Sequence, residues 1–395
     1  MHAPSAAPSL PAAKEIAQRA AIAGLEPTAP TSKGVALPRF YSLLRALENE
    51  VQARPVHIAW LGDSHTAADF WTGEVRAQLQ ARFGVGGPGF FHVALKSYRH
   101  ASLSFEQNGA WGREPGPPSL RTRTGDGVFG LGGIRTFPRS SSATFKAQPE
   151  PNATLGEAMW KVRVRLGNAD RVRLSSGEHS FTLTGDEVPK IEEQVLPAPR
   201  GEALHVRVLA GAPQFLGGSL ESSQGGVVLH TLGVDGARVE TALAWNEEAW
   251  KLELAQREVG LVVLAFGTNE AFDQRAPAAY AEHYARVMAR VRAAVPSADC
   301  LIIGLPDALD ANGQPHPRVP EIGKVQEETA AHLGCAFFSA ASAMANEGGF
   351  AGWLLATPRL AKADGIHLTI SGYQLLGART VAAIVSGYEE FLEGR

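Results

Sequence analysis

Five short apolar runs restrict the fold more than any other feature, because each is followed by a segment with helical spacing. The runs are four to eight residues long and lie at Val56–Leu61, Val227–Leu232, Val259–Phe266, Cys300–Leu305 and Cys335–Phe338. A run of this length that is apolar at every position indicates a strand covered on both faces. Five such strands alternating with helices predict a parallel sheet with helices on both sides.

The stretch between the first and second runs has a different pattern. Val or Leu alternates with Arg or His at every second position in Lys161–Leu166, Arg171–Leu174, Phe181–Leu183 and Leu204–Val208. A period of two is typical of half-buried antiparallel strands. We therefore predict an inserted all-β sandwich at residues 93–225, which divides the α/β domain into residues 36–92 and 226–395.

Charge and hydropathy argue against nucleic-acid binding and against a membrane-spanning segment. The 395 residues carry a formal net charge of −3 and contain no block of basic residues, so we expect no nucleic-acid partner. No stretch approaches the roughly 18 apolar residues of a membrane span, so we expect no integral membrane segment. Oligomeric state is not predictable from these features.

The N-terminal 35 residues are rich in Ala, Pro and Ser. They lack the basic start and apolar core of a signal peptide. We interpret them as a disordered leader or as what remains of a trimmed export sequence.

Two cysteines, Cys300 and Cys335, each begin an apolar run. Free cysteine is among the most buried residue types. We expect two reduced core cysteines, with a disulfide as the alternative.

Candidate catalytic residues follow the predicted strands. Ser64 comes after the first strand, Gly236 after the second and Asn269 after the third, while Asp364 and His367 precede the last helix. Ligand sites of open parallel sheets lie at the carboxyl ends of the strands. We therefore expect these five residues to meet at one edge.

These residues belong to four blocks: Gly62–Ser64, Gly233–Ala237, Gly267–Asn269 and Asp364–His367. In this order they resemble the blocks of the SGNH, or GDSL-type, hydrolases over residues 54–92 and 226–395. The resemblance implies a flavodoxin-like three-layer α/β/α fold with a five-stranded parallel sheet, and an esterase without cofactor or metal. It also implies a catalytic triad of Ser64, Asp364 and His367, and an oxyanion hole formed by the backbone N–H groups of Ser64 and Gly236 and the side-chain amide of Asn269.

Residues beside these blocks depart from the family or invite other interpretations. His65 stands where the family usually has Leu, and Glu270 where Asp is common. His65 with Asp69 could suggest a metal site, but two ligands are too few. We interpret His65 as a helix residue near the pocket, and Asp63 as a structural residue that bonds nearby backbone.

A narrower resemblance is to bacterial peptidoglycan O-acetylesterases. It rests on the run His65–Trp71, the turn Gly84–Phe91 and the β insertion. It implies removal of acetyl groups from the C6 hydroxyl of N-acetylmuramic acid, in the periplasm or cell envelope, by a protein with a carbohydrate-binding-like insert.

Three other functions remain open: acetyl transfer to a sugar, deacetylation of another polysaccharide, and glycan binding by an inactive hydrolase. The insert is attached at the sheet edge opposite the catalytic one. It must either extend around to that edge or bind polymer at a distance.

Overall fold

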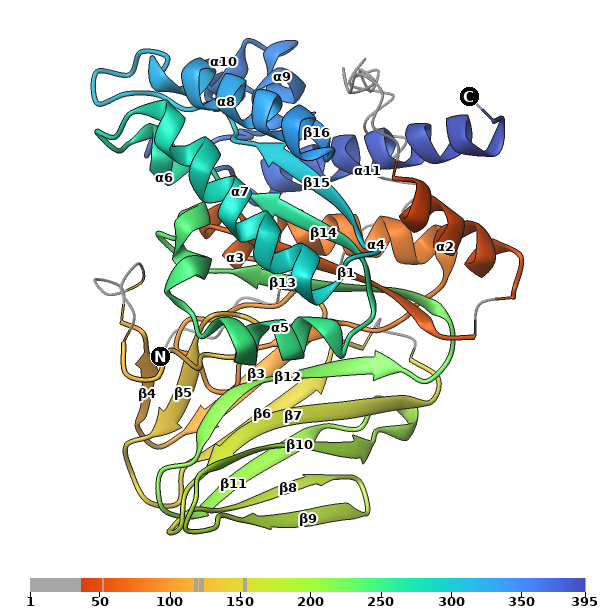
Figure 1. The fold of residues 1–395 in the computed structure, drawn as a ribbon, viewed down its shortest axis with the longest axis vertical. Coiled ribbons are helices and arrows are strands. Elements are labelled where there is room, and N and C mark those ends of the chain that lie inside the picture. Colours follow the sequence, from red (N-terminus) through yellow and green to blue (C-terminus); the bar gives the residue numbers. More distant parts are fainter. Residues whose placement is uncertain (1–36, 52, 117–119, 121–123, 152–154, 395) are drawn as a thin grey trace.

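The central element of the protein is a five-stranded parallel sheet (Figure 1). In the computed structural model, which describes residues 37–394 apart from 52, 117–119, 121–123 and 152–154, its strand order is β13-β1-β14-β15-β16. The strands are β13 (Gly226–Gly233), β1 (Pro55–Gly62), β14 (Val259–Ala265), β15 (Asp299–Gly304) and β16 (Ala336–Ser339). Numbered along the chain, this order is 2-1-3-4-5, as in flavodoxin. The five predicted strands and their parallel pairing are confirmed, whereas the predicted leader at residues 1–35 lies outside the described residues.

Helices cover both faces of this central sheet. One face carries α2 (Pro38–Glu48), α4 (Trp71–Phe83), α9 (Ala340–Ala345), α10 (Gly349–Leu355) and α11 (Ile370–Leu392). The other face carries η3 (Val239–Ala244), α5 (Glu247–Ala255), α7 (Pro277–Ala294) and α8 (Arg318–Leu333). Within β1, Ile58 and Trp60 enter the first core, while Ala59 and Leu61 enter the second. Because side chains alternate along a strand, burial on both faces explains the uninterrupted apolar runs.

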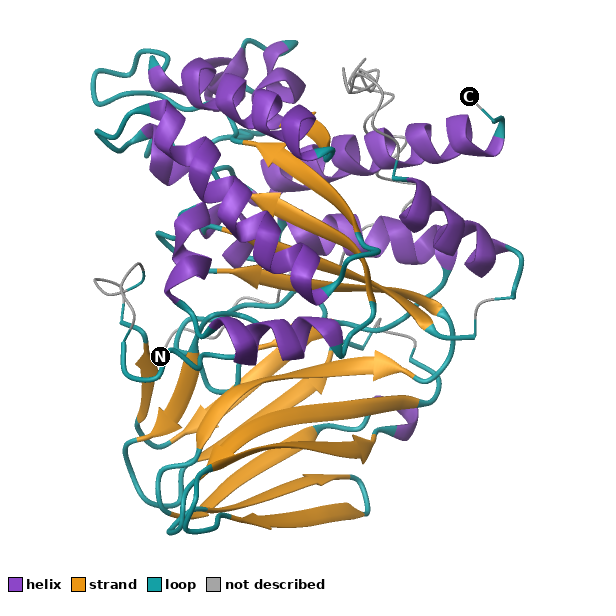
Figure 2. Cartoon of the chain, viewed as in Figure 1, coloured by secondary structure: helices purple, strands orange, loops and turns teal. Residues whose placement is uncertain are grey.

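Residues 89–222 contribute two antiparallel sheets, here called the β region (Figure 2). The first contains β10 (Lys190–Pro197), β7 (Ala158–Leu166), β12 (Gln214–Ser222), β5 (Arg135–Pro138) and β4 (Trp111–Glu114), with β2 (Gly89–Phe91) paired to β12. The second contains β3 (Leu103–Asn108), β6 (Thr144–Pro149), β11 (Leu204–Ala210), β8 (Arg171–Ser176) and β9 (His179–Thr184). Side chains from both sheets, such as Trp160 and Val206, share one core.

The β region also packs against the α/β part of the chain. Phe129, Leu131 and Ile134 join the same core as Trp245 and Trp250. These contacts bring the residues just before β5 against η3 and α5. The two antiparallel sheets are therefore not attached through β12 and β13 alone.

The expectation of two reduced cysteines is wrong, because Cys300 and Cys335 form a disulfide. Cys300 lies in β15, and Cys335 immediately precedes β16, which is the neighbouring parallel strand. Their Cα atoms are 4.8 Å apart, within the range that a disulfide spans. The pairing follows from the strand order, which brings the two positions side by side.

None of the helices that the structure describes is both long enough and apolar enough to cross a bilayer.

Candidate active site

The serine block occupies the turn between β1 and the short helix α3 (Ser64–Ala67). Asp63 precedes the helix, and its Oδ1 accepts a hydrogen bond from the backbone N–H of His65 at 3.0 Å. Burial raises the pKa of Asp63 to about 8, against the opposing effect of this hydrogen bond. Asp63 therefore has the structural role predicted for it. Ser64 is the first residue of α3, so its backbone N–H has no partner within the helix.

Three side chains form a continuous hydrogen-bonded series at the carboxyl edge of the central sheet. Ser64 Oγ lies 3.0 Å from Nε2 of His367. Nδ1 of the same imidazole lies 2.9 Å from Oδ2 of Asp364. The structure thus brings together the three residues predicted to form a triad, although 303 residues separate Ser64 from His367.

Asp364 is held by its own turn as well as by the imidazole. Its Oδ1 accepts the backbone N–H groups of His367 at 2.8 Å and of Ile366 at 2.9 Å. Partial burial would raise the pKa of Asp364, but these two backbone bonds and the imidazole lower it on balance. The carboxylate is therefore ionised at neutral pH and can orient and stabilise a protonated imidazole.

The Asn269 and Gly236 loops are joined to each other. Asn269 lies in α6 (Thr268–Ala271), and its Nδ2 donates to the carbonyl oxygen of Ala237 at 2.9 Å. An amide nitrogen has two N–H groups, so one remains for a ligand. Glu270 is fully buried and accepts the N–H of Val239 at 2.9 Å and that of Gly267 at 3.1 Å. Burial raises the pKa of Glu270 to about 7 despite these bonds.

Gly236 has a φ of +76°, in the left-handed region that favours glycine. A Cβ added there would meet only Leu120 Cδ1, at 3.8 Å. The glycine is therefore required by the backbone conformation, whereas close packing around it imposes no such requirement. Leu120 belongs to the β region, which thus borders the predicted oxyanion loop.

His65 is a buried helix residue beside the triad, as predicted. Its Nδ1 is 2.9 Å from the hydroxyl of Tyr373, and its ring centroid is 5.3 Å from that of His367. Asp69 forms an ion pair with Arg76 at 2.8 Å. Neither side chain is directed to a shared metal position.

Within the described part of the chain, one group of three side chains has the composition of a metal site. His57, Glu221 and His230 offer ligand atoms within 4.8 Å of one another. Nδ1 of His57 is 3.0 Å from Nε2 of His230, and Glu221 bonds to Lys161. These atoms pair with each other and with a cation, so the group behaves as a polar cluster between the sheets. No sequence motif predicts this cluster, because its members come from three separate strands.

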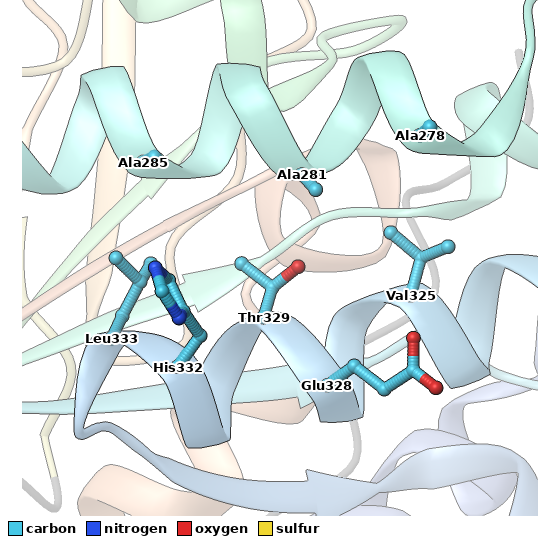
Figure 3. Close-up of a pocket in the computed structure, with 8 residues that line it drawn as sticks. All are labelled: Ala278, Ala281, Ala285, Val325, Glu328, Thr329, His332 and Leu333. Carbon is cyan, nitrogen blue, oxygen red and sulfur yellow. The ribbon is translucent and has the colours of Figure 1, made fainter.

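A groove between α7 and α8 lies apart from these residues (Figure 3). It is lined by Ala278, Ala281, Ala285, Val325, Glu328, Thr329, His332 and Leu333. None of the predicted site residues lines it, and we assign it no role in the chemistry.

Comparison with known proteins supports the family assigned from the four blocks. Residues 202–375 match the GDSL-like Lipase/Acylhydrolase family. The chain carries a GDSL-like acylhydrolase domain. The matched range contains Gly236, Asn269, Asp364 and His367, whereas Ser64 precedes it. The protein is a carboxylic ester hydrolase. No curated protein matches the sequence.

Solved structures similar to this GDSL-like chain include one described as "Peptidoglycan O-acetylesterase in action, 5 min". It is 23% identical, with a TM-score of 0.74 over 89% of this chain and 96% of the other. This likeness shows the SGNH hydrolase fold. Two others have lower TM-scores: a lipase/acylhydrolase from Enterococcus faecalis (25% identity, TM-score 0.33, 41% and 77% of the two chains) and a family two carbohydrate esterase from Cellvibrio japonicus (10%, 0.31, 73% and 99%).

Proposed function

We propose that this protein is a serine acetylesterase that removes O-acetyl groups from peptidoglycan, at the C6 hydroxyl of N-acetylmuramic acid. The observation that carries the proposal is the series of two hydrogen bonds from Ser64 through His367 to Asp364. A serine hydroxyl is a weak nucleophile unless a neighbouring base takes its proton. The three residues have the contacts that this chemistry requires.

The reaction proceeds in two halves. His367 Nε2 accepts the Ser64 proton while Oγ attacks the ester carbonyl, and the imidazolium is stabilised by Asp364. The oxyanion is bound by the backbone N–H groups of Ser64 and Gly236 and by the free amide N–H of Asn269. His367 then protonates the departing sugar hydroxyl, which leaves acetyl-Ser64. Water then attacks the acetyl carbon while His367 takes its proton, and His367 returns this proton to Ser64 Oγ as the C–Oγ bond breaks and acetate leaves.

The identity of the substrate is supported by two features. The similarity to the structure described as a peptidoglycan O-acetylesterase extends over 89% of the chain and so includes the β region. In addition, Leu120 of the β region borders Gly236. A polymer that reaches Ser64 would therefore also meet the β region.

We also propose the domain organisation and the location. Residues 36–92 and 226–395 form the hydrolase domain, and residues 93–225 form a carbohydrate-binding-like insert, with β2 paired to that insert just before its boundary. The Cys300–Cys335 disulfide supports a place outside the cytoplasm, in the periplasm or cell envelope.

The esterase proposal is tested by release of nitrophenol from 4-nitrophenyl acetate. Ser64→Ala should lose at least a thousandfold in kcat. Ser104→Ala is the matched control, because Ser104 is an exposed serine on β3, and it should retain wild-type rates. Equal rates for wild type and Ser64→Ala would exclude an esterase that uses this serine.

The substrate is tested by acetate release from O-acetylated peptidoglycan, acetylated xylan and simple esters. We expect the highest kcat/KM on peptidoglycan. Higher activity on xylan would favour the other polysaccharide, and acetylated product formed from an added acceptor glycan would favour a transferase. Binding to glycan without any ester cleavage would favour an adapter.

A further inference from the structure

An aromatic pair with one exposed ring lies on two loops that adjoin the site. Phe272 leaves 42% of its surface in solvent, and its ring centroid lies 4.3 Å from that of His316. The two rings are tilted by 45°, so His316 packs against Phe272 and leaves part of the phenyl ring open. We propose that Phe272, supported by His316, is a stacking platform for a pyranose ring of the substrate, next to the ester that Ser64 attacks. This inference rests on the proposed function and specifies how that site selects a glycan.

The position of Phe272 is fixed by the oxyanion loop. Its backbone N–H donates to the carbonyl oxygen of Thr268 at 3.3 Å, which continues the turn of α6. Phe272 follows Asn269 by three residues in the sequence. Because the helical turn continues to Phe272, this spacing places the two side chains next to each other on its surface. The ring consequently lies beside the amide that would bind the oxyanion.

The position of His316 is fixed by the loop between β15 and α8. The backbone N–H of His316 donates to Ala308 at 2.9 Å, and that of the adjacent Leu309 donates to Gly365 at 2.8 Å. Gly365 lies within the turn that carries Asp364 and His367. The pair thus connects the Asn269 loop to the triad turn, and Figure 1 shows α6 beside the loop that precedes α8.

The chemistry of the pair suits a sugar. Aromatic faces carry partial negative charge and attract the weakly positive C–H groups of an apolar surface, such as one face of a pyranose. Nδ1 of His316 accepts the backbone N–H of Arg318 at 3.3 Å. In the neutral ring this leaves the proton on Nε2, where it can donate to a sugar hydroxyl. Phe272 thus provides the stacking surface, and His316 provides a directional hydrogen bond.

The test compares two substrates and two phenylalanines. Phe272→Ala is paired with Phe181→Ala, because Phe181 is similarly exposed, at 40%, but lies on β9. For each protein we would measure kcat/KM on soluble fragments of O-acetylated peptidoglycan and on 4-nitrophenyl acetate. Phe272→Ala should lower the ratio of glycan to small-ester kcat/KM roughly tenfold, mainly through KM, a size consistent with one aromatic contact.

Further variants separate the effect of ring stacking from the effect of side-chain volume. Phe272→Tyr should keep the wild-type ratio, Phe272→Leu should lose it, and Phe181→Ala should leave it unchanged. An unchanged ratio in Phe272→Ala, or a loss in Phe181→Ala instead, would overturn the platform. A wild-type protein that cleaves 4-nitrophenyl acetate but no glycan ester would refute the proposed function itself, and this result requires no variant.

Discussion

Replacing Asp364 by Asn tests the triad more stringently than removing the serine does. Oδ1 of Asp364 accepts two backbone N–H groups, and Oδ2 faces Nδ1 of His367. An amide offers one oxygen and one NH2 group. If the oxygen keeps the two backbone bonds, the NH2 faces His367 and forces the proton of the imidazole onto Nε2. If the amide rotates, its NH2 meets two donors, and those bonds are lost.

The magnitude follows from the first arrangement. An imidazole protonated at Nε2 cannot accept the Ser64 proton, although the shape of the site is unchanged. In triads of this kind such a change of tautomer lowers kcat by about 10⁴, which corresponds to about 5.5 kcal/mol of barrier. We expect this loss for Asp364→Asn, with little change in KM.

The assay is hydrolysis of 4-nitrophenyl acetate near pH 7.5, with melting temperature as a check on folding. Asp310→Asn is the matched control, because Oδ1 of Asp310 also accepts two backbone N–H groups, from Asn312 and Gln314, but its carboxylate does not bind the triad imidazole. It should stay near wild type. A kcat for Asp364→Asn within tenfold of wild type, in a folded protein, would refute the assigned role of the carboxylate.

Three further predictions concern the oxyanion loop, the disulfide and a buried acid. Asn269→Ala should lower kcat by about 10²–10³ on 4-nitrophenyl acetate, and a loss below tenfold would contradict the oxyanion role. Serine at both Cys300 and Cys335 should lower the free energy of unfolding by about 4 kcal/mol, since the bond closes a 35-residue span; an unchanged denaturation midpoint would contradict this. Because the pKa of Asp63 is raised to about 8 in the folded protein, its contribution to stability is complete below about pH 4 and is lost as pH rises towards 8. Asp63→Asn should therefore show a shallower decline over this range in denaturant titrations, and an identical decline would contradict the raised pKa.

The central sheet was predictable because its signal is local. Each strand is mostly apolar along its length, and its predicted bounds differ from the observed ones by at most one residue at either end, as in β1 and β15. β10 was not predicted, because it lacks such a local signal. It is an edge strand on which half of the residues are exposed and one is buried, so it has no apolar alternation to detect.

The site was predictable in its residues but not in its supports. The blocks around Ser64, Asn269 and His367 are recognisable as sequence. By contrast, the bonds from Glu270 to Val239 and Gly267 depend on two loops whose contact only the strand order creates. The disulfide was misjudged for the same reason, since its two cysteines are neighbours only across paired strands.

The point at which the β region joins the central sheet does not by itself tell whether this region reaches the catalytic edge. Its contacts near Gly236 show that it does. It joins the central sheet at Gly226, the start of β13, which is the edge opposite Ser64. Burial lowers the pKa of Arg113 in β4, and the Asp235 carboxylate next to Gly236 offsets this in part. A Cβ on Gly236 would lie 3.8 Å from Leu120 Cδ1, so the β region extends to the carboxyl edge.

Ion pairs also tie the end of β4 to β5. Arg135 of β5 binds Glu114 of β4 at 2.6 Å and Asp126 at 2.8 Å. The β region therefore forms a wall next to Gly236, where Leu120 lies. Phe272 and His316 stand on the loops that carry Asn269 and the triad turn. A glycan ester at Ser64 would lie between this wall and that aromatic pair, so the selection of substrate should depend on residues from both parts of the chain.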